Sequence, residues 1–345
     1  NNVDEVQSLK FSGLQGQFQV APKATAVQGS MTVASLEAVG KPVAASEGQA
    51  ASSAGQVNLR DLSLKVNQRQ GAFDLLFGES SFKISELSIK DQNTGAPFLI
   101  NDLSINASLT PQGAQQVAAE MLIKAGKVTA DQQSGEGSFK LTLRNLDGAT
   151  VVQLQQWQEK FAANPNDPKM FEELLKLMKT LLNGKPEFLI DSQAKLAQGD
   201  WRGQLTLNFQ SLGEVNPLLD PSGLMKALEK GAAEVAVSKP LVEALLISSA
   251  KETALAQAQK EGSATDDATI QNLAAQQVAQ QLQGLMATGF VKLDGDTYKS
   301  TAKFENGKLS VNGQDIPLTA GAADSATDEE TPEEPDAAEE PAPHQ

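Results

Sequence analysis

The fold is decided by a recurring stretch of sequence, seen most clearly as Phe82-Lys83-Ile84-Ser85-Glu86-Leu87-Ser88-Ile89. Apolar and polar residues alternate on each side of the Ser85-Glu86 pair, which is the pattern of a half-buried strand. The pair shifts the alternation by one residue, so a straight strand would send its two halves to opposite faces. We therefore predict a β-bulge or a sharp bend at this pair, which restores one apolar face and curls the sheet.

The same string of apolar-x-apolar-x-x-Leu-x-apolar occurs at three further places. The copies are Met31-Val33-Leu36-Ala38, Val57-Leu59-Leu62-Leu64 and Phe98-Ile100-Leu103-Ile105. Their spacing is too irregular for a strict solenoid, but it suits similar antiparallel hairpins joined by turns such as Asn93-Thr94-Gly95. We read them as one curved, elongated sheet, although so loose a pattern also recurs by chance in β-proteins.

Beyond residue 145 the apolar period changes from two to 3.6, which indicates helices. Asp167 followed by Pro168 is a helix start, and Asn183-Gly184 is a helix end. The sequence therefore predicts an α+β fold: an elongated curved antiparallel β-meander with helical inserts and a C-terminal β-hairpin. The expected segments are a curved sheet (1–145), a helical insert (146–185), a β-hairpin that continues the sheet (186–212), Ala/Gln-rich helices (213–288), a closing β-hairpin (289–318) and a disordered acidic tail (319–345).

Composition excludes several kinds of chemistry. The 345-residue chain has no Cys and a single His, His344, so thiol catalysis, cysteine-bound metals and histidine-based acid–base chemistry are not expected. No phosphate loop, dinucleotide fingerprint or nucleophile elbow is present. We predict no catalytic residues, no metal site and no cofactor. The net charge of −15 and the absence of a basic patch argue against nucleic acid as a partner.

Two features leave alternatives open. The tail from 321 to 345 carries nine acids and no Lys or Arg, so it is either a solubilising terminus or an arm that binds a basic partner. The helix expected near 270–286 is apolar on one face and Gln-rich on the other. It either lies on a membrane or packs on the sheet, and its lack of Lys and Arg favours packing.

The closing segment carries a family resemblance. The run from Tyr298 through Phe304, Asn306-Gly307 and Leu309-Ser310-Val311-Asn312-Gly313 resembles the C-terminal signature of the bacterial YdgA-like family. The order of strands, helical insert, hairpin and Ala-rich helices is also similar to that family. The resemblance implies a cell-envelope protein of unassigned function, with a periplasmic body and an N-terminal anchor in the inner membrane. Since the chain starts at Asn1 and not at Met, we expect it to be that body without its anchor.

We therefore expect a non-enzymatic periplasmic protein that acts as a binding or scaffolding module for an envelope protein, with a homodimer as a further option. The alternative is a lipid-binding or lipid-transfer protein that holds phospholipid in an apolar groove on the curved sheet. The candidate lining residues of that groove are Phe82, Ile84, Leu87, Ile89, Leu103 and Ile105. Helices that cover this face would instead make it an ordinary core.

Overall fold

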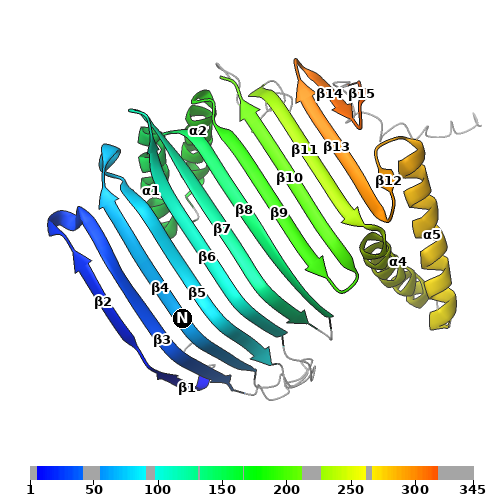
Figure 1. The fold of residues 1–345 in the computed structure, drawn as a ribbon, viewed down its shortest axis with the longest axis horizontal. Coiled ribbons are helices and arrows are strands. Elements are labelled where there is room, and N and C mark those ends of the chain that lie inside the picture. The colour runs from blue at the N-terminus through cyan, green and yellow to red at the C-terminus, as the bar shows by residue number, and fades with distance from the viewer. Residues whose placement is uncertain are drawn as a thin grey trace, which may run out of the picture.

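The structure, a computed structural model, describes residues 6–41, 55–90, 98–130, 133–165, 167–211, 227–261 and 266–317. Its centre is one long, open, antiparallel sheet (Figure 1). The first strands are β1 (Val6–Ser12), β2 (Gln15–Val20), β3 (Ala26–Gly40), β4 (Gln56–Gln70), β5 (Leu76–Lys90), β6 (Phe98–Gln112), β7 (Gln116–Ala130) and β8 (Gln133–Asp147). The others are β9 (Glu187–Leu196), β10 (Gly199–Phe209), β11 (Leu228–Ser238), β12 (Lys292–Asp294), β13 (Thr297–Glu305), β14 (Lys308–Val311) and β15 (Gln314–Ile316).

The sheet follows the chain with few exceptions. Its order is β1-β3-β4-β5-β6-β7-β8-β9-β10-β11-β13-β14-β15, with β2 also paired to β3 and β12 to β13. Strands that are neighbours in sequence are therefore almost always neighbours in space, as in a meander. The predicted α+β class, with a curved antiparallel meander, helical inserts and a C-terminal hairpin, is confirmed.

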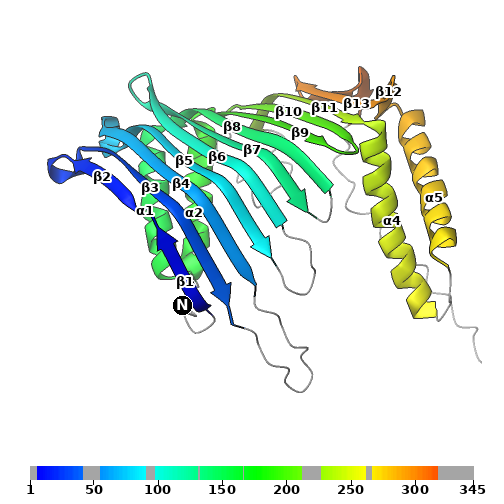
Figure 2. The ribbon, with the colours of Figure 1, turned by 60° about the horizontal axis from the view of Figure 1, so that its bottom comes forward.

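Two helix pairs interrupt the meander. The first pair is α1 (Gly148–Ala163) and α2 (Pro168–Asn183), and the second is α4 (Lys239–Glu261) and α5 (Asp267–Ala287). The sheet curves like an arch, and both helix pairs lie on the same side of it (Figure 2). We call this side the helix face and the other side the outer face.

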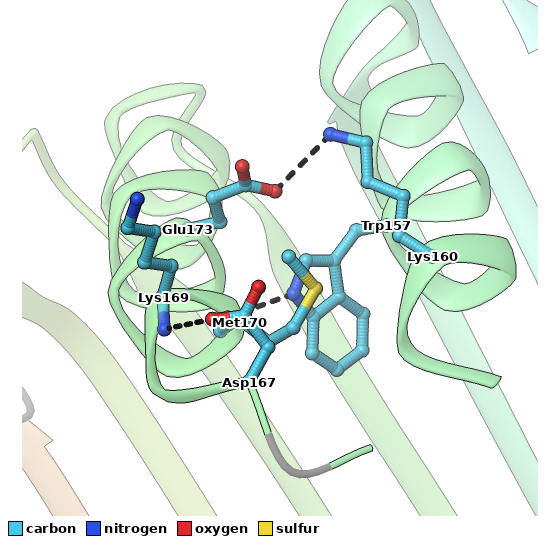
Figure 3. A network of polar contacts seen from close by, with 6 residues as sticks. All are labelled: Trp157, Lys160, Asp167, Lys169, Met170 and Glu173. Carbon is cyan, nitrogen blue, oxygen red and sulfur yellow. Dashed lines mark hydrogen bonds and ion pairs between the residues drawn. The ribbon is translucent and has the colours of Figure 1, made fainter. Parts of the chain in front are cut away.

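Capping residues define where the helices of the first pair begin. Asp147 caps α1, because its carboxylate accepts hydrogen bonds from the backbone N–H (2.8 Å) and the hydroxyl (2.6 Å) of Thr150. Asp167 caps α2 by accepting a hydrogen bond from the backbone N–H of Lys169 at 3.0 Å, and Pro168 occupies the first helical position as predicted. The two helices are joined by the Trp157 Nε1–H, which donates to the carbonyl of Met170 at 2.8 Å (Figure 3).

One expectation for the segment 213–288 was wrong. Residues 228–238 form strand β11 and not a helix, and this strand pairs with β10 on one side and β13 on the other. Gly231, Ala233, Val235 and Val237 share one face of this strand. Because the strand pairs on both edges, strand formation outweighs the helix propensity of its Ala residues. The acidic tail expected at 319–345 lies outside the described residues.

Candidate functional site

The candidate site is the apolar surface of the sheet on the helix face. Paired residues in a sheet share a face, so the strand register traces this surface from strand to strand. One such row passes through Leu64, Phe82, Ile105, Ile123 and Phe139. We call the part of this surface between the helix pairs the apolar floor; its side chains are Met31, Leu59, Leu64, Phe82, Ile84, Leu87, Ile100, Leu103, Ile105, Met121, Ile123, Phe139, Leu141 and Ile190.

The floor stays on one face of the sheet even where a residue pair such as Ser85-Glu86 shifts the alternation of apolar and polar residues. Strand β8 runs straight through this region, and its Gly135 and Gly137 share a face. They pair with Val128 and Ala125, which are three residues apart on β7, so β7 contains the extra residue of a bulge. Ala125 continues the row of Ile123, and Val128 pairs with Ile100 on β6. The predicted restoration of one apolar face is therefore confirmed.

The bend crosses six strand positions in one line. Matching registers place Gly13, Ala34, Asp61, Ser85, Asp102 and Gly126 opposite one another in successive strands. Left-handed backbone occurs at every second strand, with φ of 64° at Gly13, 50° at Asp61 and 53° at Asp102. The register does not slip from β3 to β7, so these strands bend together and only β7 against β8 shows a shift. We call these six residues the bend line.

The first helix pair covers the helix face of the sheet at the strand ends near the β4–β5 turn. Leu75, Val117, Leu146 and Leu181 are buried together there, with 1–7% of each side chain exposed. Half-buried Leu143, Val151 and Leu154, among others, pack around them. A second small cluster places Leu182 of α2 against Phe209 of β10.

The second helix pair covers the other end of the same face. Val278 and Leu282 of α5 pack on Tyr298 of β13, and Met286 and Val291 lie around them. The predicted apolar stripe of this helix is buried at Ile270, Ala274, Val278 and Leu282. Leu273 and Leu285, two further apolar residues of this helix, are instead exposed at 55% and 43%.

The floor between the two helix pairs belongs to none of these clusters. Apart from Ile84, which is 5% exposed, its side chains are only partly buried, whereas Val117 under the first helix pair is 1% exposed. A hollow of about 610 Å³ opens where the floor meets α1, lined by Leu109, Ala119, Met121, Leu141, Leu143 and Val151. The polar residues of its rim are Gln68, Asp74, Ser80, Ser108, Glu120 and Gln155. This volume lies within the range of small-molecule sites, about 300–1,000 Å³.

All six residues predicted to line a groove lie on the helix face. Phe82 pairs with Ile105, Ile84 with Leu103, and Ile89 with Phe98. Their surroundings differ: Ile84 is buried, whereas Ile89 is 40% exposed near the far end of β5. None of the six borders the hollow, but Ala107 and Leu109 continue the strand of Leu103 and Ile105 into it. Their role in binding stays a prediction.

Sequence reasoning missed a second hollow on the outer face. It measures about 630 Å³ and is lined mainly by amides and hydroxyls, including Gln17, Gln28, Ser30, Asn67, Ser81 and Asn106. These are the polar residues that alternate with the apolar floor, so the signal was present in the sequence. The alternation predicts only that they form the solvated side of the strands, because it does not show where that side is hollowed.

The ionisable groups with shifted pKa values lie in one helix cap and in one ion pair. Hydrogen bonds from Thr269 lower the pKa of Asp266, the cap of α5. The Lys299 ammonium, 2.6 Å away, lowers the pKa of Asp294, and the same contact raises the pKa of Lys299. Within the described ranges, no three His, Cys, Asp or Glu side chains are grouped so that they could hold a metal ion. No helix among these residues is long and apolar enough to cross a membrane.

Comparison with known proteins places this architecture in a family. Residues 2–319 match the family model described as "Bacterial protein of unknown function (DUF945)". The chain belongs to this bacterial family. The match covers the meander, both helix pairs and the closing strands, so the family description applies to the whole of the sheet and not to one part of it. No curated protein and no solved structure matches the chain.

Proposed function

We propose that this DUF945 protein is a non-enzymatic binding module that holds lipid acyl chains on its apolar floor. The observation that carries the proposal is the partly buried floor, which continues into the 610 Å³ hollow beside α1. Apolar surface gains about 25 cal/mol for each Å² removed from water, without a need for specific partners. Extended hydrocarbon chains suit such a surface, because they can follow a row of Leu, Ile and Phe side chains.

The polar groups at the rim support a ligand with one polar end. Gln68 Nε2 donates to Ser80 Oγ at 3.1 Å, and Asp74 Oδ1 accepts from Gln70 Nε2 at 3.0 Å. Gln68, Asp74 and Ser80 line the hollow together with Gln155 of α1. Because Asp74 and Glu120 are the charged residues of the lining, the fitting headgroup carries a cation: a phosphatidylethanolamine could place its chains on the floor and its ammonium beside the Asp74 carboxylate.

We further propose that the protein works in the bacterial cell envelope, as a periplasmic body anchored to the inner membrane. The support is the resemblance of the segment from Tyr298 to Gln314 to the YdgA-like family. The structure of this segment depends on Asn312, whose Oδ1 accepts from Thr301 N–H at 2.9 Å and whose Nδ2 donates to the carbonyl of Gly289 at 2.8 Å. Fractionation of bacterial cells and protease accessibility in spheroplasts test this location.

A scaffold for an envelope protein is the second candidate. It is favoured by large apolar side chains that project from the helices into solvent. Phe171 of α2 is 61% exposed, Leu245 of α4 is 60% exposed, and Leu273 of α5 is 55% exposed. These side chains form no part of the floor, so a partner held by them would survive substitutions in the floor.

The test of lipid binding uses two neighbouring residues with opposite orientations. Ile105→Asp puts a carboxylate on the floor between Phe82 and Ile123. Ser104→Asp adds the same charge on the outer face, where the register partners are Lys83 and Lys124. The floor residue Ile84 is unsuitable because it is 5% exposed, and a buried carboxylate there would unfold the chain.

The first readout is native mass spectrometry of protein isolated from a bacterial envelope, followed by lipid extraction. The second is titration with a phosphatidylethanolamine that carries a fluorophore on one acyl chain. We expect bound lipid in the wild type and in Ser104→Asp, and at least a tenfold weaker titration for Ile105→Asp. Circular dichroism confirms that both variants are folded. A lipid-free wild type that also ignores the fluorescent lipid would overturn the proposal in favour of the scaffold.

A further inference from the structure

The hollow of about 630 Å³ on the outer face, which we call the polar hollow, is built by two neighbouring rows of side chains. One row crosses the strands from Gln17 on β2 to Leu122 on β7, and the other crosses the same strands from Gln19 to Glu120. Adjacent strands lie about 4.8 Å apart, so the five steps from β2 to β7 span about 24 Å. Both helix pairs lie on the other side of the sheet, so no described helix covers the polar hollow (Figure 2). Its shape suits an elongated ligand.

The side chains of the polar hollow are mostly polar and uncharged. Of the twelve that belong to the two rows, eight are Gln, Asn or Ser, three are charged (Lys65, Glu79 and Glu120), and one is Leu122. Glu120 forms an ion pair with Lys140 at 3.0 Å. The polar hollow therefore presents many hydrogen-bonding groups and little net charge.

The amides and hydroxyls of the polar hollow have no partners of their own. None of the eight side chains makes a hydrogen bond among the residues that the structure describes. Ser81 and Asn106, which pair at the centre of the hollow, are half-buried, so water reaches them less freely than an exposed side chain. Farther along the same face such groups do pair, since Gln193 Nε2 donates to Ser138 Oγ at 3.1 Å. In the polar hollow the donors and acceptors are left for a ligand.

We propose that the polar hollow binds a neutral glycan chain. A sugar hydroxyl both donates and accepts hydrogen bonds, and so do the amide of Asn or Gln and the hydroxyl of Ser. One amide can therefore donate to one hydroxyl of a sugar ring and accept from the next. Leu122 offers an apolar contact for the C–H groups of the ring. The proposal does not depend on lipid binding, since the apolar floor lies on the opposite face of these strands.

Other classes of ligand fit the polar hollow less well. Polyanions such as nucleic acids need clustered Lys and Arg, whereas Lys65 is the one cation in the two rows. Peptides are commonly bound by strand addition at a free sheet edge or by pockets for their side chains. Strands β3 to β7 are paired on both edges, and Leu122 is the one apolar side chain of the two rows. An acyl chain would gain little here, because it would cover polar groups that need hydrogen bonds.

Two variants remove hydrogen-bonding groups from the polar hollow. Asn106→Ala acts at its half-buried centre, and Asn67→Ala acts at an exposed side chain on β4. Neither substitution breaks a side-chain hydrogen bond within the described part of the chain. The matched control is Asn208→Ala, which makes the same change on the outer face of β10, outside the polar hollow. Circular dichroism checks that all three variants are folded.

A glycan array that carries neutral and acidic oligosaccharides identifies the ligand, with cello-, malto- and chito-oligosaccharides as the neutral probes. Isothermal titration calorimetry with the strongest neutral probe then measures the affinity. We expect a Kd of about 1 mM or tighter for the wild type. This Kd should not change when salt is added, because salt screens only interactions between charges. Asn106→Ala should raise it by about fivefold or more and Asn67→Ala by a smaller factor, whereas Asn208→Ala should leave it unchanged.

The titration with fluorescent phosphatidylethanolamine keeps this site separate from the floor. Asn106→Ala should leave that titration unchanged, because Ile105 faces the floor and Asn106 faces the polar hollow. The absence of any bound neutral oligosaccharide, a preference for acidic ones, or equal effects of the substitutions at 106 and 208 would each overturn the proposal.

Discussion

Substitutions on the bend line distinguish the energetic effect of backbone conformation from that of side-chain packing. Asp102 lies on the bend line with φ of 53°, and its side chain is exposed. For an ordinary residue this left-handed backbone conformation costs about 1–2 kcal/mol. The cost is lower for Asp than for most residues and highest for β-branched residues. We therefore expect Asp102→Val to lower the free energy of unfolding by about 2 kcal/mol. Asp102→Gly should change it by less than about 0.5 kcal/mol, since relief of strain offsets the flexibility of Gly.

Urea denaturation followed by circular dichroism measures both changes. With an m-value of about 3 kcal/mol/M, a loss of about 2 kcal/mol lowers the urea midpoint by about 0.7 M. Ser104→Val is the matched control, because this residue lies two positions along the same strand without positive φ. Val suits a strand there, so the midpoint should stay the same or rise. Equal losses for Val at 102 and at 104, or a larger loss for Gly than for Val at 102, would refute the account of the bend.

Three further predictions concern the helix pairs. Leu75→Ala should cost about 2–5 kcal/mol in urea denaturation, because Leu75 is 2% exposed in the cluster under α1, whereas Leu245→Ala, at a side chain 60% exposed, should cost less than about 0.5 kcal/mol. Asp147→Ala removes both hydrogen bonds to Thr150 and should cost about 0.5–2 kcal/mol, with Asp147→Asn retaining most of the cap. The pKa of Asp266 is lowered from 3.8 in the folded chain, so its contribution is complete above that value and is lost as the pH falls through the lowered pKa. The difference in thermal midpoint between wild type and Asp266→Ala should therefore be present at pH 7 and disappear in strong acid; a difference that persists there would contradict the cap.

The sequence predicted the bend because its signal is local. The string Phe82-x-Ile84-x-x-Leu87 contains both the alternation and its interruption, and the rule that one face must stay apolar leaves a bend as the solution. The helix caps at Asp167 and Gly184 were equally local. What the sequence did not reveal was that the bends of six strand positions would align, since alignment depends on register between strands.

The missed strand β11 shows where local signals fail. The residues from Leu228 to Ser238 include three Ala and two Glu, which favour helix in isolation. In the folded chain this segment fills the space between β10 and β13, and a helix there would leave both edges unpaired. Long-range strand pairing therefore decides between helix and strand for this segment, and such pairing cannot be inferred from the segment alone.

The candidate site was predictable only in part, for the same reason. Alternation identified the face that carries Phe82, Ile84, Leu103 and Ile105. It did not show which part of that face the helices would cover, because α1 and α2 follow β8 in the chain and pack back on the ends of several earlier strands. The hollow beside α1 arises from this packing and has no counterpart in the local pattern.

The distribution of the core has a consequence for function. The three clusters of buried residues lie where helices meet the sheet, at Leu75 and Val117, at Leu182 and Phe209, and at Val278 with Tyr298. Apart from Ile84, the floor side chains between them are only partly buried, so we expect each of these to contribute less to folding than a side chain in a cluster. Floor substitutions such as Ile105→Asp should therefore alter binding at a smaller cost in stability than any substitution in a cluster.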